Sequence, residues 1–132
     1  MNMISRDEWK RQKGIKKFLL SFTYPIKGLR YAYRNEQNLA VDVGVALLVT
    51  AAGFIFKLNL VEWAILALTI GLVISCELIN TAIEAVVDLV TEDYHPLAKV
   101  AKDTAAAAVF VFAIVAVIVG LIIFLPKVIA LF

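Results

Sequence analysis

Cysteine and histidine are almost absent from this chain. Its 132 residues include one cysteine, Cys76, and one histidine, His95. A single thiol cannot form an internal disulfide, and no cluster of Cys and His offers the four ligands of a structural zinc site. The sequence therefore excludes a disulfide scaffold and a zinc-stabilised domain.

Charged residues are also scarce. They make up 18% of the chain, and hydrophobic residues make up 62%, whereas soluble domains are roughly a quarter charged and about half apolar. Three membrane helices of about 20 residues each would use nearly half of the chain, which leaves no room for a separate soluble nucleotide-binding domain. We therefore expect a single membrane domain over residues 1–132, with its chemistry at the bilayer.

The cations are unevenly distributed along the chain. Nine of the 13 lysines and arginines precede residue 39, and the other four are Lys57, Lys99, Lys102 and Lys127. Because cytoplasmic flanks of membrane helices are rich in these residues, the N-terminus is expected in the cytoplasm. The first apolar run begins too late for a cleaved signal peptide, so we expect the whole chain to be retained.

Apolar runs predict three transmembrane helices, at about residues 38–56, 61–90 and 101–125. The third run is uncharged from Thr104 and is expected to end at Pro126. The second run carries acidic residues in its second half, so this helix is expected to extend beyond the bilayer into the cytoplasm. Segments 57–59 and 91–101 then form the outer and inner connections.

Large apolar residues recur at helical spacing in residues 1–35, with basic residues between them. They are Trp9, Phe18, Leu19, Phe22, Ile26, Leu29 and Tyr33. This pattern predicts an amphipathic helix on the cytoplasmic membrane surface. Pro25 is expected to break it into two pieces, because proline is tolerated in the first turn of a helix and not in its interior. Given this membrane setting, we expect no nucleic-acid partner.

One face of the second predicted span is polar. At 3.6 residues per turn, Glu77, Asn80, Glu84 and Asp88 fall within an arc of roughly 80°. If Trp63 marks the outer interface, Glu77 lies roughly 21 Å into a hydrocarbon core about 30 Å thick. Acids at such a depth usually mark a functional site.

Charged residues from the other spans lie at the same level. Glu36 precedes the first span, and Lys102 and Asp103 precede the uncharged part of the third. Carboxylates, an amide and a lysine at this boundary favour phosphoryl transfer, which uses carboxylates to bind magnesium and to accept a proton. Two alternatives stay open: Glu84 and Asp88 as a solvated helix end, and a proton or ion conductor that uses Glu77 as its relay.

The stretch Glu77 to Asp88 reads Glu-x2-Asn-x3-Glu-x3-Asp, which resembles the signature of the prokaryotic diacylglycerol kinase family. The resemblance continues through Lys27-Gly28-Leu29-Arg30, Asn35-Glu36, Tyr94-His95 and Ala101-Lys102-Asp103. It is strongest for the Gram-positive branch, whose members are undecaprenol kinases. It implies an all-α homotrimeric bundle in the bacterial cell membrane, in which each subunit has a surface helix and three spans. Active sites shared between neighbouring chains would transfer the γ-phosphate of ATP to a lipid hydroxyl with Mg²⁺.

The resemblance also implies roles for individual residues. Glu77 corresponds to the general base and Asn80 to the asparagine that supports the site, whereas Glu36 and Glu84 correspond to the metal-binding pair. Nucleotide contacts are implied for Lys17, Tyr24, Asp93, Tyr94, His95, Lys102 and Asp103. Gram-negative members carry an arginine at the position of Lys17, so a planar fork is replaced by a point charge.

The remaining questions concern the substrate and two acids. The sequence does not separate undecaprenol from diacylglycerol as the acceptor, and it leaves the roles of Asp42 and Asp88 open. No glycine-rich loop of the form Gly-x4-Gly-Lys-Ser/Thr occurs, so ATP use follows from the resemblance and from the layer of carboxylates and lysine. Three helices are too few to surround a nucleotide, a metal and a lipid headgroup, which favours an oligomer.

Overall fold

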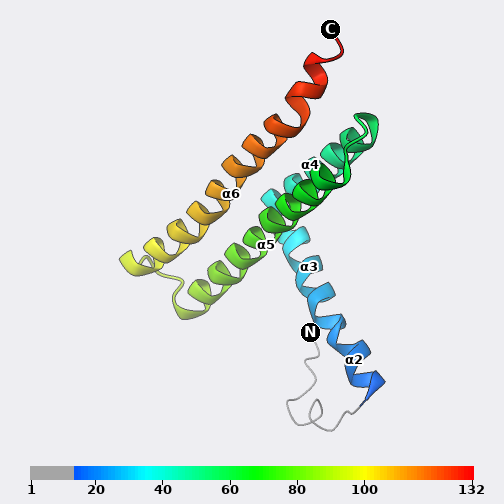
Figure 1. The fold of residues 1–132 in the computed structure, drawn as a ribbon. Helices are drawn as coiled ribbons and strands as arrows, with labels where there is room; N and C mark the ends of the chain where they lie inside the picture. Colours follow the sequence, from blue (N-terminus) through cyan, green and yellow to red (C-terminus); the bar gives the residue numbers. More distant parts are fainter. Residues whose placement is uncertain (1–13) are drawn as a thin grey trace. The chain divides into compact units, whose positions relative to one another are not determined.

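The computed structural model describes residues 14–132, all of whose regular structure is helical (Figure 1). The helices are α2 (Ile15–Ser21), α3 (Thr23–Asn35), α4 (Gln37–Ile55), α5 (Leu60–Val90) and α6 (Pro96–Ile129). The last three are long and apolar enough to cross a membrane. The predicted fold, an all-α membrane protein with an N-terminal helical segment and three spans, is confirmed.

The chain divides into two units, and the first ends at Asn35. Its described part consists of α2 and α3, which meet at Phe22. Pro25 lies in the first turn of α3, where its missing N–H is not needed by the helix. The predicted break near this proline is therefore confirmed. The portion of the expected surface helix before Gly14, including Trp9, lies outside the described residues.

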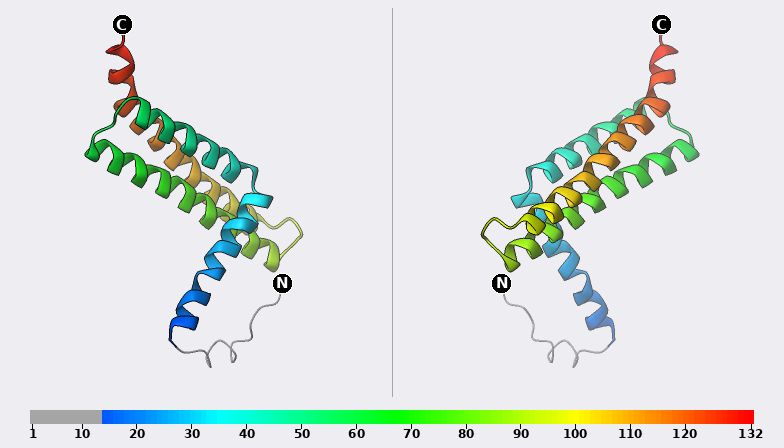
Figure 2. Two further views of the ribbon diagram at one scale, coloured as in Figure 1. Left: turned by 90° about the vertical axis from the view of Figure 1, so that its right-hand side faces the viewer. Right: turned by 90° about the vertical axis from the view of Figure 1, so that its left-hand side faces the viewer.

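The second unit, residues 36–132, is a bundle of the three long helices. The helix α5 packs against both α4 and α6, and the chain reverses direction at each connection, so neighbouring helices are antiparallel (Figure 2). Because the reversals bring the start of α4, the end of α5 and the start of α6 to one end of the unit, three separate polar segments meet there. This arrangement positions the candidate site.

The opposite end of the unit is fixed by polar contacts of Glu62. Asn59 caps α5 by accepting a hydrogen bond from the Glu62 N–H at 3.0 Å, and the Asn59 N–H donates to Glu62 Oε2 at 2.8 Å. The other carboxylate oxygen, Oε1, pairs with Lys127 Nζ of α6 at 3.0 Å. A reciprocal cap of this kind fixes the helix start, and the ion pair joins that start to α6.

The third span differs from the prediction at both ends. It begins at Pro96, because proline is favoured in the first turn, and His95 caps it by accepting a hydrogen bond from the Leu97 N–H. The prediction that Pro126 ends this helix is wrong, since α6 continues to Ile129. Proline removes a single backbone donor, and helices in lipid tolerate that loss when neighbouring groups are satisfied. The Pro126 carbonyl accepts a hydrogen bond from Ala130.

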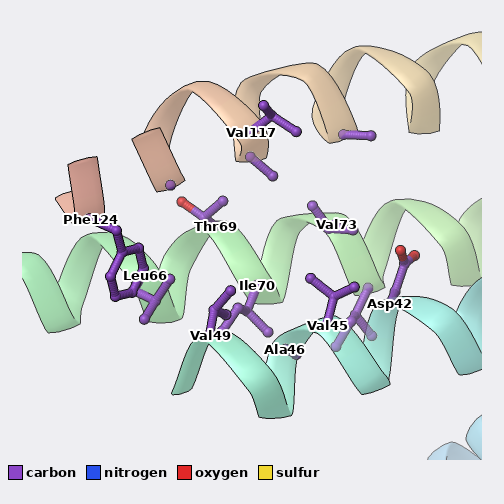
Figure 3. A pocket seen from close by; sticks show the side chains of 14 residues that line it. Asp42, Val45, Ala46, Val49, Leu66, Thr69, Ile70, Val73, Val117 and Phe124 are labelled. Atoms are coloured by element: carbon purple, nitrogen blue, oxygen red, sulfur yellow. The ribbon is translucent and has the colours of Figure 1, made fainter. Parts of the chain in front are cut away.

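An apolar groove lies between α4, α5 and α6 (Figure 3). Its volume is about 340 Å³. Its lining residues are Asp42, Val45, Ala46, Val49, Leu66, Thr69, Ile70, Val73, Ile74, Ala113, Ala116, Val117, Gly120 and Phe124. Phe124 lies toward one end and the carboxylate of Asp42 toward the other (Figure 3). The groove therefore leads along the apolar helices to a single acid.

Among the glycines of the described residues, Gly53 of α4 has the closest neighbours. A Cβ atom at this position would lie 2.7 Å from the tip of the Trp63 indole and 3.1 Å from Leu58 Cδ1. A Cβ at Gly44, in the same helix, would meet nothing within 4 Å. Close packing thus requires glycine at position 53, whereas a larger side chain would fit at position 44.

We expect Gly53→Ala to destabilise the protein relative to Gly44→Ala. Either substitution gains about 1 kcal/mol of helix propensity, but only the first overpacks the contact with Trp63, at a cost of about 1–3 kcal/mol. Thermal unfolding of both variants in detergent checks this. Equal melting temperatures for the two variants would contradict the close packing at Gly53.

Candidate active site

Glu77 is the most deeply buried acid among the described residues, with 3% of its surface exposed. The side chain of Asn38, in the first turn of α4, interacts with its carboxylate. The charges of Glu36, Asp42 and Glu84 act on the same carboxylate. The predicted meeting of acids from the start of the first span with those of the second is therefore found within one chain.

Asn80 and Glu84 form the next layer of the polar face of α5. Asn80 Nδ2 donates a hydrogen bond to Glu84 Oε1 at 3.0 Å. The amide oxygen, Asn80 Oδ1, is buried, and no described residue donates a hydrogen bond to it. A buried acceptor without a partner is costly. Asn80 therefore orients Glu84 and leaves one buried oxygen for a ligand.

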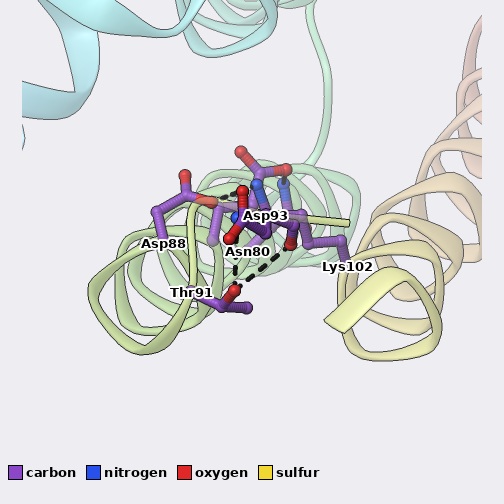
Figure 4. Close-up of polar contacts among 6 residues, drawn as sticks. Asn80, Asp88, Thr91, Asp93 and Lys102 are labelled. Carbon is purple, nitrogen blue, oxygen red and sulfur yellow. Dashed lines mark hydrogen bonds and ion pairs between the residues drawn. The ribbon is translucent and has the colours of Figure 1, made fainter. Parts of the chain in front are cut away.

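Asp88 and Lys102 link this face to α6. Lys102 Nζ lies 2.5 Å from Asp88 Oδ1, and Figure 4 shows the lysine side chain reaching from α6 toward the end of α5. The charge of Glu84 also acts on the ammonium group. The lysine therefore stands at the same level as the carboxylates, as its position in the sequence predicts.

Glu36 and Glu84 are the residues expected to bind a metal ion. Glu36 is the N-cap residue of α4, but its side chain makes no capping hydrogen bond, and both acids are half-buried. Within residues 14–132 of one chain, no group of three or more His, Cys, Asp or Glu side chains could hold a metal. Magnesium does not need such a group, because it binds one or two carboxylates together with phosphate oxygens and water.

The other predicted nucleotide contacts do not join this cluster. Asp103 pairs with Lys99 one turn earlier on α6, where both side chains are exposed. His95 acts as a helix cap, Tyr94 is exposed, and the backbone of Asp93 is hydrogen-bonded to the Thr91 hydroxyl in the turn before α6.

Lys17 and Tyr24 belong to the first unit, on α2 and α3 respectively. Conversely, sequence reasoning did not single out Asn38. The signal for it was indirect, since antiparallel packing of α4 on α5 places the first turn of α4 opposite Glu77.

The comparisons with known proteins agree with one another. The profile of the prokaryotic diacylglycerol kinase family matches residues 23–124. The undecaprenol kinase of Bacillus subtilis (strain 168) is 45% identical over 121 residues, which cover 92% of this chain and 98% of that protein.

Two diacylglycerol kinases are also similar. The diacylglycerol kinase of Synechocystis sp. is 45% identical over 114 residues, which cover 86% of this chain and 65% of that protein. The diacylglycerol kinase of Escherichia coli (strain K12) is 35% identical over 105 residues, which cover 80% of this chain and 86% of that protein. The chain belongs to the prokaryotic diacylglycerol kinase family. It is therefore a multi-pass membrane lipid kinase with ATP as cosubstrate, and the resemblance read from its polar motif is confirmed.

Family membership makes the polar face of α5 the candidate active site of this kinase. The matched residues include the whole of α4 and α5 and all of α6 up to Phe124. The candidate site thus lies inside the region that the family profile matches, at the end of the bundle where three polar segments meet.

The hydrogen bond between Asn80 and Glu84 predicts an order of stability. Asn80→Ala removes one hydrogen bond to a charged group, worth about 1.5–3 kcal/mol. Asn80→Asp removes the same bond and adds a carboxylate facing Glu84, so we expect it to unfold at a lower temperature than Asn80→Ala. Thermal unfolding in detergent with EDTA measures this order. An aspartate variant as stable as the alanine variant would show that residue 80 does not face Glu84.

Proposed function

We propose that this kinase transfers the γ-phosphoryl group of ATP to the hydroxyl of undecaprenol at the cytoplasmic membrane interface. The observation that supports it is the buried carboxylate of Glu77, surrounded by Asn38, Glu36, Asp42 and Glu84 and accompanied by Lys102. Undecaprenol is preferred as the acceptor because the relative named for it covers nearly the whole chain. Diacylglycerol is the alternative acceptor, from the relatives named diacylglycerol kinase.

In the proposed reaction, Glu77 is the general base. As the hydroxyl oxygen of the lipid bonds to the γ-phosphorus of ATP, its proton passes to the Glu77 carboxylate. The bond between that phosphorus and the β–γ bridging oxygen breaks, and ADP leaves. Asn80 holds Glu84 in place, and the Lys102 ammonium offsets the negative charge of the phosphates.

The donor types of the candidate site suit a magnesium ion. Glu36 and Glu84 supply carboxylates, and Asn80 Oδ1 is a buried amide oxygen without a donor among the described residues. Hard oxygen donors of this kind, completed by phosphate oxygens, are what Mg²⁺ prefers. When bound, the ion would neutralise charge on the phosphate groups of ATP.

The proposal also covers the orientation of the chain in the membrane, its oligomeric state and the place of the lipid chain. Cations concentrated before residue 39 support a cytoplasmic N-terminus, which places the site where ATP is available. A homotrimer is proposed because one chain offers too few helices to enclose a nucleotide and a lipid headgroup. The lipid chain is proposed to lie in the apolar groove, since that groove ends at Asp42, whose charge acts on Glu77.

We expect Glu77→Gln to lower phosphoryl transfer at least 100-fold, because glutamine cannot accept the proton and general-base catalysis contributes roughly 10²–10⁴-fold. The assay is ADP release by purified protein in lipid with Mg²⁺, ATP and an added lipid alcohol. Glu62→Gln, which alters the acid at the other end of α5, is the control and should retain the wild-type rate.

The same assay distinguishes the alternatives. Side-by-side rates on undecaprenol and diacylglycerol identify the acceptor. Activity of Glu77→Gln comparable to wild type would refute the proposed base.

Filling the apolar groove should affect the lipid more than the nucleotide. Ala116→Leu places three extra carbon atoms in the groove, so we expect a higher KM for the lipid alcohol and an unchanged KM for Mg-ATP. The control is Ala67→Leu, because Ala67 is exposed on α5 and lies outside the groove. Loss of the native oligomer in cross-linking, rather than a higher lipid KM, would assign the groove to a neighbouring subunit.

A further inference from the structure

We infer that Asp88 is a positioning residue of the kinase: its carboxylate holds the Lys102 ammonium at the phosphate-binding end of the site. This inference rests on the proposed function, which gives Lys102 a role at the nucleotide phosphates. It assigns a role to the last acid of the polar motif, which motif spacing alone left open.

The first argument is geometric. The pair joins two helices rather than two turns of one helix, with Lys102 Nζ 2.5 Å from Asp88 Oδ1 (Figure 4). A lysine side chain has a long flexible stem and a charge without preferred direction. Its ammonium group therefore needs a fixed acceptor if it is to stay at one place, and Asp88 is that acceptor.

The second argument concerns what surrounds the pair. Asp88 lies one helical turn beyond Glu84, and Glu84 is held by Asn80. The charge of Glu84 acts on Lys102 as well. Asp88 thus draws the lysine onto the face of α5 that carries the proposed metal ligand, where phosphate oxygens bound to the metal would lie within its reach.

The neighbouring lysine of α6 shows the contrast. Lys99 pairs with Asp103 within α6, and that pair is exposed. An exposed pair within one helix fixes neither partner relative to α5. Of these two lysines, Lys102 is the one that a residue of α5 directs to the carboxylate face.

A purely structural role is the competing explanation, and the chain provides a control for it. Glu62 and Lys127 form a second ion pair between α5 and α6, at the opposite end of the helices. If ion pairing served only to hold α5 against α6, breaking either pair would have similar consequences for catalysis. If Asp88 positions Lys102, only the inner pair matters for the nucleotide.

The test compares Asp88→Asn, Asp88→Glu and Lys127→Gln with wild type in lipid vesicles. We expect Asp88→Asn to raise the KM for Mg-ATP roughly two- to fivefold, the range that an exposed ion pair allows. The kcat and the KM for the lipid alcohol should change by less than about twofold, because uniform binding is lost rather than transition-state stabilisation. Asp88→Glu should restore most of the affinity, and Lys127→Gln should leave the KM for Mg-ATP unchanged.

A second measurement does not depend on turnover. The rise in melting temperature on adding Mg-ATP should be smaller for Asp88→Asn than for wild type. In a Lys102→Met background, Asp88→Asn should have no further effect on that rise, because Asp88 acts through the lysine.

Several outcomes would overturn the inference. An unchanged KM for Mg-ATP in Asp88→Asn would do so, as would an equal increase of that KM in Lys127→Gln. So would an additive effect of Lys102→Met and Asp88→Asn on the rise in melting temperature. A loss of kcat of a hundredfold or more in Asp88→Asn would instead make Asp88 part of the metal site or the catalytic machinery. Absence of Mg-ATP turnover by wild type with either lipid alcohol is a separate result, which refutes the proposed function itself.

Discussion

Acidic side chains in an apolar helix must be partnered, and this constraint organises the end of the bundle that carries the candidate active site. Burying a carboxylate without compensation costs several kcal/mol or more. Glu77 meets Asn38 of α4, Glu84 accepts a hydrogen bond from Asn80, and Asp88 pairs with Lys102 of α6. Partnering the acids of α5 therefore requires both neighbouring helices to end at the same level, which is also what assembles the site.

Two ion pairs join α5 and α6, an outer pair of Glu62 with Lys127 and an inner pair of Asp88 with Lys102, and their surroundings differ. The outer pair involves Glu62, whose other carboxylate oxygen already caps α5, so both partners are held by the helix start. Within residues 14–132, the aspartate of the inner pair has no second hydrogen bond, and this pair is more exposed than the outer one. The outer pair is suited to fixing the hairpin, whereas the inner pair leaves its lysine accessible to a ligand.

Features set by residues close together in the sequence can be predicted from it, whereas contacts between packed helices cannot. Uncharged apolar runs predict the three spans, and the 3.6-residue period predicts the shared face of Glu77 and Glu84. The end of α6 was mispredicted because proline stops helices in water more strictly than in lipid. The contacts of Asn38 and Asp88 were not predictable, because they depend on how far each helix is rotated about its axis when it packs against α5.

Lys102 and Asp103 are consecutive residues of α6, and their side chains point in different directions. Neighbouring residues of an α-helix point about 100° apart, so Lys102 and Asp103 cannot both face α5. Lys102 takes that direction, and Asp103 pairs with Lys99 on another face. If both residues contact nucleotide, as the family resemblance implies, one contact has to be made at a surface outside the α5 face. In the proposed homotrimer a neighbouring chain would provide such a surface, and the proposed sharing of active sites between subunits then has a physical reason.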